Sequence, residues 1–141
     1  MGDQYIKIGC EVFIQQGNSI LLGNRKNCYG EGTWALPGGH LEYGEKLVDA
    51  AQREMEEELG IDVPHMKLLT VAENTDDRGH YIHLSFLAED FVGTIQCMEP
   101  QFCYEWRFFP LNELPKPFLK AHEVILKTYF KRVVYLGNKD C

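Results

Sequence analysis

GGHLEYGEKLVDAAQREMEEELGI, residues 38–61, contains the clearest helix signal in the chain. Helix-forming residues dominate from Lys46 to Leu59, Gly60 stands where a C-terminal cap belongs, and Pro64 soon follows to prevent continuation. The Pro-Gly-Gly triplet at 37–39 cannot lie within a helix. The sequence therefore predicts a helix over 46–59, preceded by a tight glycine-rich segment.

The predicted helix carries carboxylates along one side. At about 100° per residue, Glu54, Glu57 and Glu58 share an arc of about 100°. The apolar stripe beside them consists of Ala51, Met55 and Leu59. Two carboxylates 4 Å apart repel each other by about 4 kcal/mol at an effective dielectric near 20. Oxygen ligands without His or Cys favour Mg²⁺ or Mn²⁺, so the cluster indicates a divalent-cation site.

An acidic run can also be only a solvated helix face, and its neighbours in sequence decide between the two interpretations. Gly38 and Gly39 leave a bare backbone beside the helix start, where amide groups can approach a phosphate closely. Glu45 lies at that start, and Arg53 can pair with Glu57 one turn on. The combination favours a cation that joins the acidic helix to a phosphate.

The other segments predict a mixed α/β domain. Strand patterns cover 5–15, 20–23, 34–36, 67–73, 80–89 and 104–109, and a second amphipathic helix covers 118–133. Residues 16–19 supply a turn for an opening hairpin, and 80–89 is expected to pair with 104–109. We expect a single domain over 1–141, an α/β/α sandwich in which two main helices flank a curved mixed sheet.

Composition excludes several function classes. A formal net charge of −7 argues against binding of extended nucleic acid, which needs clustered Lys and Arg. No apolar run approaches the ~20 residues of a membrane span, and the start lacks the features of a secretory signal, so a cytoplasmic location is expected. The five cysteines are scattered without a Cys-x-x-Cys pair and are expected to be free thiols.

The acidic segment resembles the Nudix box, Gly-x5-Glu-x7-Arg-Glu-U-x-Glu-Glu-x-Gly-U, where U is a bulky apolar residue. Every defined position is met, by Gly39, Glu45, Arg53, Glu54, Met55, Glu57, Glu58, Gly60 and Ile61. Residues 32–45 further resemble the MutT-type branch of the family, which hydrolyses nucleoside triphosphates, with Tyr43 in place of a Phe. The likeness covers about residues 5–115 and implies a Nudix-type fold.

The resemblance assigns the metal site. It implies that Glu54, Glu57 and Glu58 ligate Mg²⁺ and that the Gly38 carbonyl completes the coordination. Arg53 is then a catalytic-site residue that orients these carboxylates together with Glu45.

Further residues are implied around the metal site. Glu105 matches a metal-side glutamate of some relatives, acting through water or as the base, and is otherwise a surface glutamate. Arg25, His40 and the Gly38–Gly39 backbone are expected to bind the substrate, although Arg25 is equally consistent with an exposed loop.

The implied reaction is hydrolysis of a nucleoside triphosphate to a monophosphate and pyrophosphate, by a water activated by Glu57 or Glu105. Hydrolysis of ADP-ribose, nucleotide sugars or dinucleoside polyphosphates is the alternative. Residues 76–78 lack the proline of ADP-ribose enzymes, and Tyr81 falls slightly late for the tyrosine of the dinucleotide type. A catalytically silent nucleotide-binding module is the alternative from another class. Homodimers are frequent among similar proteins, but no patch in this sequence indicates an interface. Aromatic side chains that could stack on a base are Trp34, Tyr81, Phe102, Tyr104 and Trp106.

Overall fold

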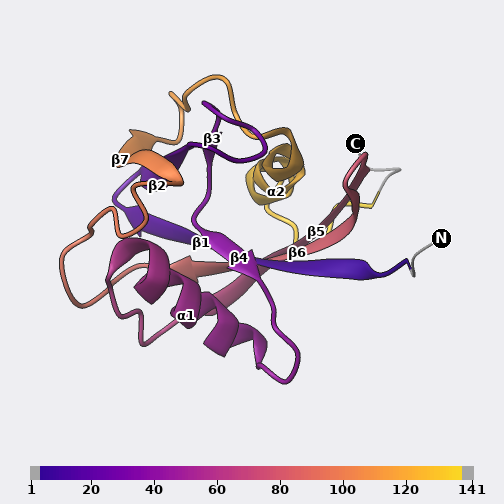
Figure 1. The fold of residues 1–141 in the computed structure, drawn as a ribbon, viewed down its shortest axis with the longest axis horizontal. Coiled ribbons are helices and arrows are strands. Elements are labelled where there is room, and N and C mark those ends of the chain that lie inside the picture. The colour runs from indigo at the N-terminus through magenta and orange to yellow at the C-terminus, as the bar shows by residue number, and fades with distance from the viewer. Residues whose placement is uncertain (1–3, 138–141) are drawn as a thin grey trace.

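A mixed, open β-sheet with a helix on each side forms the centre of the computed structural model, which describes residues 4–137 (Figure 1). The strands are β1 (Ile6–Gln16), β2 (Ser19–Arg25), β3 (Trp34–Ala35), β4 (Gly38–His40), β5 (Lys67–Asp76), β6 (Gly79–Ala88) and β7 (Cys103–Pro110). The helices are α1 (Leu47–Leu59) and α2 (Lys120–Phe130). This arrangement confirms the predicted α/β/α sandwich.

The sheet has the strand order β3-β2-β1-β6-β5, with β4 paired to β1 and β7 paired to β2 outside that path. β1 runs parallel to β6, from Ile6 opposite His80 to Ile14 opposite Ala88. The predicted opening hairpin is confirmed by the antiparallel pairing of β1 with β2.

The predicted pairing of residues 80–89 with 104–109 is wrong. β6 lies between β1 and β5, whereas β7 pairs with β2. The physical reason is burial. β6 has buried side chains on both of its faces, such as Ser85 and Phe86, and therefore suits the middle of a sheet. β7 is more exposed and lies at an edge.

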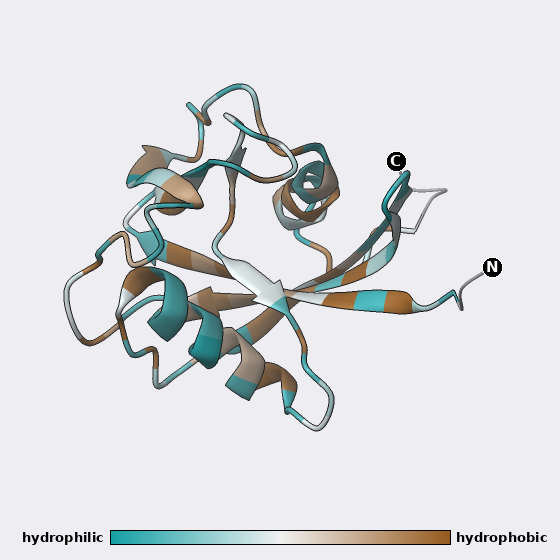
Figure 2. Ribbon diagram, in the orientation of Figure 1, coloured by the Kyte–Doolittle hydropathy of each residue, from teal (hydrophilic) through white to brown (hydrophobic). Residues whose placement is uncertain are grey.

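The side chains of β1 alternate between two cores. Val12 and Ile14 pack in the cluster that contains Met55 and Leu59 of α1. Phe13 packs on the other side, in the cluster that contains Ile125 of α2. The hydrophilic residues of α1, coloured teal in Figure 2, include those that face away from this core. One strand thus anchors both helices through opposite faces.

The helix ends follow local backbone chemistry. Gly60 caps α1 as predicted, with a left-handed φ of 68° and an N–H that donates to the Glu56 carbonyl. α2 is shorter than predicted and stops at Phe130, because Arg132 has a φ of 57° and cannot continue a right-handed helix. Val133, expected on the helix, lies beyond it and is 41% exposed.

Two further expectations concern the described residues only. None of the helices between residues 4 and 137 is long and apolar enough to cross a membrane. Cys10, Cys28, Cys97 and Cys103 are free thiols, as predicted, and Cys141 lies outside the described residues.

We expect Met55→Ala to lower the free energy of unfolding by roughly 2–5 kcal/mol, because it leaves a cavity beneath α1. Met55 is fully buried among the side chains of the β1 face. Urea denaturation followed by circular dichroism measures the change. The matched control is Glu56→Ala on the exposed side of the same helix, expected within about 0.5 kcal/mol of the parent. Equal effects of the two changes would contradict the assigned packing of α1.

Candidate active site on the acidic helix

The backbone of β4 lies directly against the carboxylates of α1. β4 pairs with β1, with Gly38 opposite Glu11 and Gly39 opposite Cys10. A Cβ atom on Gly39 would lie 2.3 Å from Cδ of Glu54. Gly38 has a φ of 149°, and a Cβ there would lie 2.2 Å from the Cys10 carbonyl oxygen. Both contacts require glycine, which accounts for the Gly-Gly pair ahead of the helix.

Arg53 gathers the acidic side chains into one network. Its Nε donates to Glu45 Oε2 at 2.8 Å, and its Nη1 donates to Glu54 Oε1 at 2.9 Å. Nη1 also lies 3.3 Å from Glu57 Oε2, which confirms the predicted pair one turn along the helix. Nη2 donates to the carbonyl of His40 at 3.1 Å. With Glu42 Oε1 3.8 Å from Nη1, a single guanidinium thus faces four carboxylates, and negative charge remains in excess.

Two of the carboxylates are partly withdrawn from water. Burial raises the pKa of Glu54, whose side chain is only 14% exposed, and repulsion from Glu57 acts in the same direction. Burial also raises the pKa of Glu58, well above its ordinary value. The Gly38 N–H opposes that shift by donating to Glu58 Oε1 at 2.8 Å.

This donor set fits a hard divalent cation. Its oxygen atoms come from Glu54, Glu57 and Glu58, and the excess negative charge stands in a partly buried place where water screens it poorly. A divalent cation would offset both the repulsion and the cost of burial, so the chemistry of these carboxylates suits a divalent cation. Among the described residues their oxygen atoms are not gathered within 4.8 Å of one another.

The other predicted residues are divided between the site and its surroundings. Arg25 lines two cavities that also reach Glu58, and its Nε donates to the Tyr29 carbonyl at 2.8 Å. His40 gives its carbonyl to Arg53 and lines the larger of these cavities. Glu105 forms an ion pair with Arg107 and lines neither cavity, so its catalytic role stays a prediction.

The sequence interpretation missed several polar residues of the two cavities. The larger one has a volume of about 120 Å³ and reaches from Gly38, Gly39 and Glu58 to further polar groups. Those polar groups are Glu11, Arg78, His83 and His122, together with Tyr81, which the sequence had offered only as an aromatic that could stack on a base. The smaller cavity places Glu99 beside Glu58. Only Glu11 carried a signal, as a charged residue within the apolar run of a strand. The others come together only in the folded chain.

We expect Gly39→Ala to weaken binding of Mg²⁺ by about 10- to 100-fold, because its methyl group would displace the Glu54 carboxylate. Gly39 does not have a positive φ, so alanine suits the backbone and the clash is the main effect. Calorimetric titration with Mg²⁺ measures the affinity. Tyr43→Ala, at a fully exposed position of the following loop, is the control and should bind as the parent does. Unchanged affinity in Gly39→Ala would remove Glu54 from the cation site.

We expect Glu58→Gln to stabilise the metal-free protein at neutral pH, because folding raises the pKa of the Glu58 carboxyl group. An acid whose pKa is raised by folding destabilises the fold as the pH rises from the unfolded value through the folded pKa, and the cost is complete above it. The gain should therefore shrink as the pH falls towards the ordinary range of a glutamate. Thermal unfolding with chelator, across pH, measures it. Glu56→Gln is the exposed control, and a Glu58→Gln protein less stable than the parent at every pH would contradict the argument.

Comparison with known proteins agrees with this geometry. Residues 7–129 match the NUDIX domain family. An ADP-ribose pyrophosphatase from Methanocaldococcus jannaschii is 38% identical over 127 residues, which cover 88% of this chain and 73% of that protein. An 8-oxo-dGTP diphosphatase from Proteus vulgaris is 39% identical over 89 residues, which cover 61% of this chain and 77% of that protein.

Longer relatives and solved structures give the same result. The chain spans 38% of the length of a mouse 8-oxo-dGDP phosphatase, NUDT18, that it also matches. The crystal structure of a MutT NUDIX hydrolase from Burkholderia pseudomallei has a TM-score of 0.83 and 33% identity, over 88% of this chain and 98% of that one. By the extent of the family match and by its relatives, this chain belongs to the NUDIX hydrolase family, as its Nudix box predicted.

Proposed function

We propose that, in the presence of Mg²⁺, the protein hydrolyses a nucleoside triphosphate to the monophosphate and pyrophosphate, or a related nucleoside diphosphate derivative to the monophosphate and the phosphate of the other group. The observation that carries the proposal is the cluster of α1 carboxylates around Arg53, directly against the bare backbone of Gly38 and Gly39. The Proteus vulgaris relative, an 8-oxo-dGTP diphosphatase, supports a triphosphate as the substrate.

Hydrolases of this family use divalent metals, and in this chain Glu54, Glu57 and Glu58 would hold the cation, with the Gly38 carbonyl as a further ligand. When bound, Mg²⁺ or Mn²⁺ neutralises charge on the phosphate oxygens and makes a water molecule more acidic. Arg53 and the Gly38 N–H restrain Glu54 and Glu58 beside the β4 backbone. Among the described residues the three carboxylates do not yet have their oxygen atoms within 4.8 Å of one another, so they would draw together around the cation.

Protein side chains would accept the proton of the attacking water and bind the phosphates. Glu57, whose side chain is 50% exposed, is the best-placed base to take a proton from the attacking water. The water oxygen forms a bond to phosphorus while the opposite anhydride P–O bond breaks and pyrophosphate leaves. Arg25 would bind a phosphate, because it lines the two cavities that Glu58 also lines. Glu105 is the weaker candidate for the base, because Arg107 already engages it.

Hydrolysis of ADP-ribose is the second candidate. It is favoured by the relative from Methanocaldococcus jannaschii, an ADP-ribose pyrophosphatase that matches most of this chain. The same carboxylates would cleave its diphosphate linkage and release AMP and ribose 5-phosphate. Dinucleoside polyphosphates and nucleotide sugars share this linkage and remain in the substrate panel. A catalytically silent module is disfavoured because Glu54, Glu57 and Glu58 are all present.

The test is product release from a panel of nucleoside triphosphates, ADP-ribose, nucleotide sugars and dinucleoside polyphosphates, with Mg²⁺ and with excess chelator. We expect Mg²⁺-dependent pyrophosphate release from triphosphates. Glu57→Gln and Glu58→Gln should each lower kcat/KM by on the order of 100-fold, because each removes a charged ligand.

Glu56→Gln is the matched control, since Glu56 lies in the same acidic run but outside the Arg53 network, and it should retain activity. Release only of AMP from ADP-ribose would replace the triphosphate by the second candidate. Full activity in both Glu57→Gln and Glu58→Gln would exclude the proposed site.

A further inference from the structure

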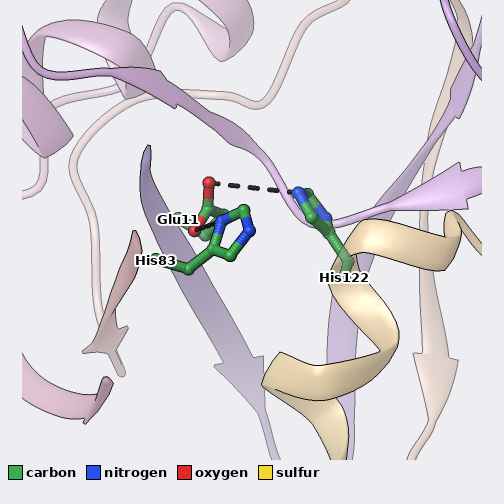
Figure 3. A group of neighbouring side chains, drawn as sticks. All are labelled: Glu11, His83 and His122. Atoms are coloured by element: carbon green, nitrogen blue, oxygen red, sulfur yellow. Dashed lines mark hydrogen bonds and ion pairs between the residues drawn. The ribbon is translucent and has the colours of Figure 1, made fainter. Parts of the chain in front are cut away.

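Three polar side chains form the far end of the larger cavity, away from α1. Glu11 comes from β1, His83 from β6 and His122 from the first turn of α2, and Figure 3 shows the three directed towards one another. Each is more than nine-tenths buried, with exposures of 4%, 4% and 7%. Buried polar groups are normally hydrogen-bonded, so each of their atoms needs a partner.

Two atoms of this trio have no such partner within residues 4–137. Glu11 Oε1 lies 3.1 Å from His83 Nδ1, but Glu11 Oε2 lies 3.9 Å from His122 Nε2, which is too far for a hydrogen bond. The Nδ1 atom of His122 accepts the backbone N–H of Leu36 at 3.2 Å. A backbone N–H can only donate, so the proton of the neutral His122 ring stays on Nε2.

The cavity therefore contains a free donor beside a free acceptor. Burial holds the pKa of His122 well below its ordinary value, so the ring is neutral and Nε2–H is its donor. Glu11 Oε2 is an acceptor regardless of which member of the Glu11–His83 pair carries the proton between them. Donor and acceptor lie 3.9 Å apart and both residues line the cavity.

A metal ion is a poor occupant for this trio, although its ligand atoms lie within 4.8 Å of one another. Ligation through His122 Nε2 would require an unprotonated nitrogen, which the Leu36 N–H excludes for a neutral ring. A phosphate is also unsuitable, because it has no N–H to offer Glu11 and would meet a carboxylate. The Gly38–Gly39 backbone, beside the carboxylates of α1, suits a phosphate better.

We propose that Glu11 and His122 recognise the base of the nucleotide, by accepting from an N–H and donating to the neighbouring acceptor on its Watson–Crick edge. The inference rests on the proposed function and adds the specificity-determining residues. Two kinds of base present such an edge. Hypoxanthine and guanine offer a ring N–H beside a carbonyl, and adenine offers an amino group beside a ring nitrogen.

The position and shape of the cavity support a base. Its volume of about 120 Å³ corresponds to only a few water molecules, at about 30 Å³ each, so it has room for one ring system, and the phosphates of a bound nucleotide would lie at its opening beside the Gly38–Gly39 backbone. The buried ring of Tyr81 supplies an aromatic wall and lies nearly parallel to His83, at 6.0 Å. Gly38 is opposite Glu11 in the sheet, so the base end directly adjoins the phosphate end.

Gly9 leaves the space that the trio occupies. A Cβ there would lie 2.7 Å from Glu11 Oε2 and 3.0 Å from His83 Nδ1. The glycine thus lets the carboxylate extend along the cavity floor, where its free oxygen is available to a ligand.

The first experiment uses the unaltered protein and measures binding of nucleoside monophosphates by calorimetry with Mg²⁺. These products contain no anhydride, so the result does not depend on turnover. Methylation of N1 in IMP removes the ring N–H, and dimethylation of N6 in AMP removes the amino donor. We expect one of the two methylated ligands to bind about 10- to 100-fold more weakly than its parent, which also identifies the kind of edge. No loss in either pair would overturn the proposal.

The second experiment tests whether Glu11 causes the weaker binding of the methylated ligand. Glu11→Ala removes the acceptor and makes room for a methyl group, so the penalty for the methylated ligand should disappear. Mere destabilisation would not produce that result, because it would weaken parent and methylated ligand alike. Glu89→Ala, the same change at an exposed site after β6, should keep the penalty. Ribose 5-phosphate, which lacks a base, should bind both variants equally.

The outcomes separate this inference from the proposed function. A penalty that persists in Glu11→Ala, or an equal loss of ribose 5-phosphate binding, would overturn base recognition by Glu11. Selective binding of monophosphates without turnover of any triphosphate would instead contradict the proposed reaction and leave base recognition standing. If Glu11→Ala does not fold, the methylated ligands on the unaltered protein still decide the matter.

Discussion

Arg53 binds Glu45, Glu54 and Glu57 at once, and the rest of the site depends on this contact. The same guanidinium reaches the His40 carbonyl and so joins α1 to the end of β4. Without that fork of donors, glutamates on one turn of helix would repel one another into solvent. With the Arg53 guanidinium in place, the glutamates stay beside the backbone of Gly38 and Gly39. They retain an excess of negative charge, which a divalent cation would neutralise.

Placing carboxylates in a partly buried position is unfavourable, and burial of the apolar side of the same helix offsets this effect. Met55 and Leu59 are fully buried against β1, while Glu54 and Glu58 stand beside them with raised pKa values. Without the apolar stripe, α1 would not pack against the sheet. Without the acidic arc, α1 would offer no ligands to a cation. Each of these glutamates directly precedes one of the buried apolar residues, Glu54 before Met55 and Glu58 before Leu59. Packing of the apolar side chains therefore fixes the carboxylates in place, although each carboxylate would be more stable in water.

The features that the sequence predicted are local ones. The cap at Gly60, the apolar stripe and the Arg53–Glu57 pair all lie within one helix, where periodicity alone places side chains. The parallel pairing of β1 with β6 joins strands about seventy residues apart, and no local pattern specifies it. For the same reason His83 and His122, which come from a strand and a helix far apart in sequence, were not recognised as neighbours of Glu11.

The alternation of β1 explains how one short domain can offer two kinds of chemistry. Cys10 and Val12 face α1 and its acidic arc, while Glu11 between them faces the opposite side and the start of α2. Gly38 lies beside Glu11 in the sheet and donates to Glu58, so it is the point where the two sides meet. A ligand with an anionic end and a heterocyclic end would meet cation-dependent contacts on one side of this strand and hydrogen-bond recognition on the other. A carboxylate that recognises an N–H would repel a phosphate, so Glu11 and the Gly38–Gly39 backbone, which line one cavity, would contact different ends of the ligand.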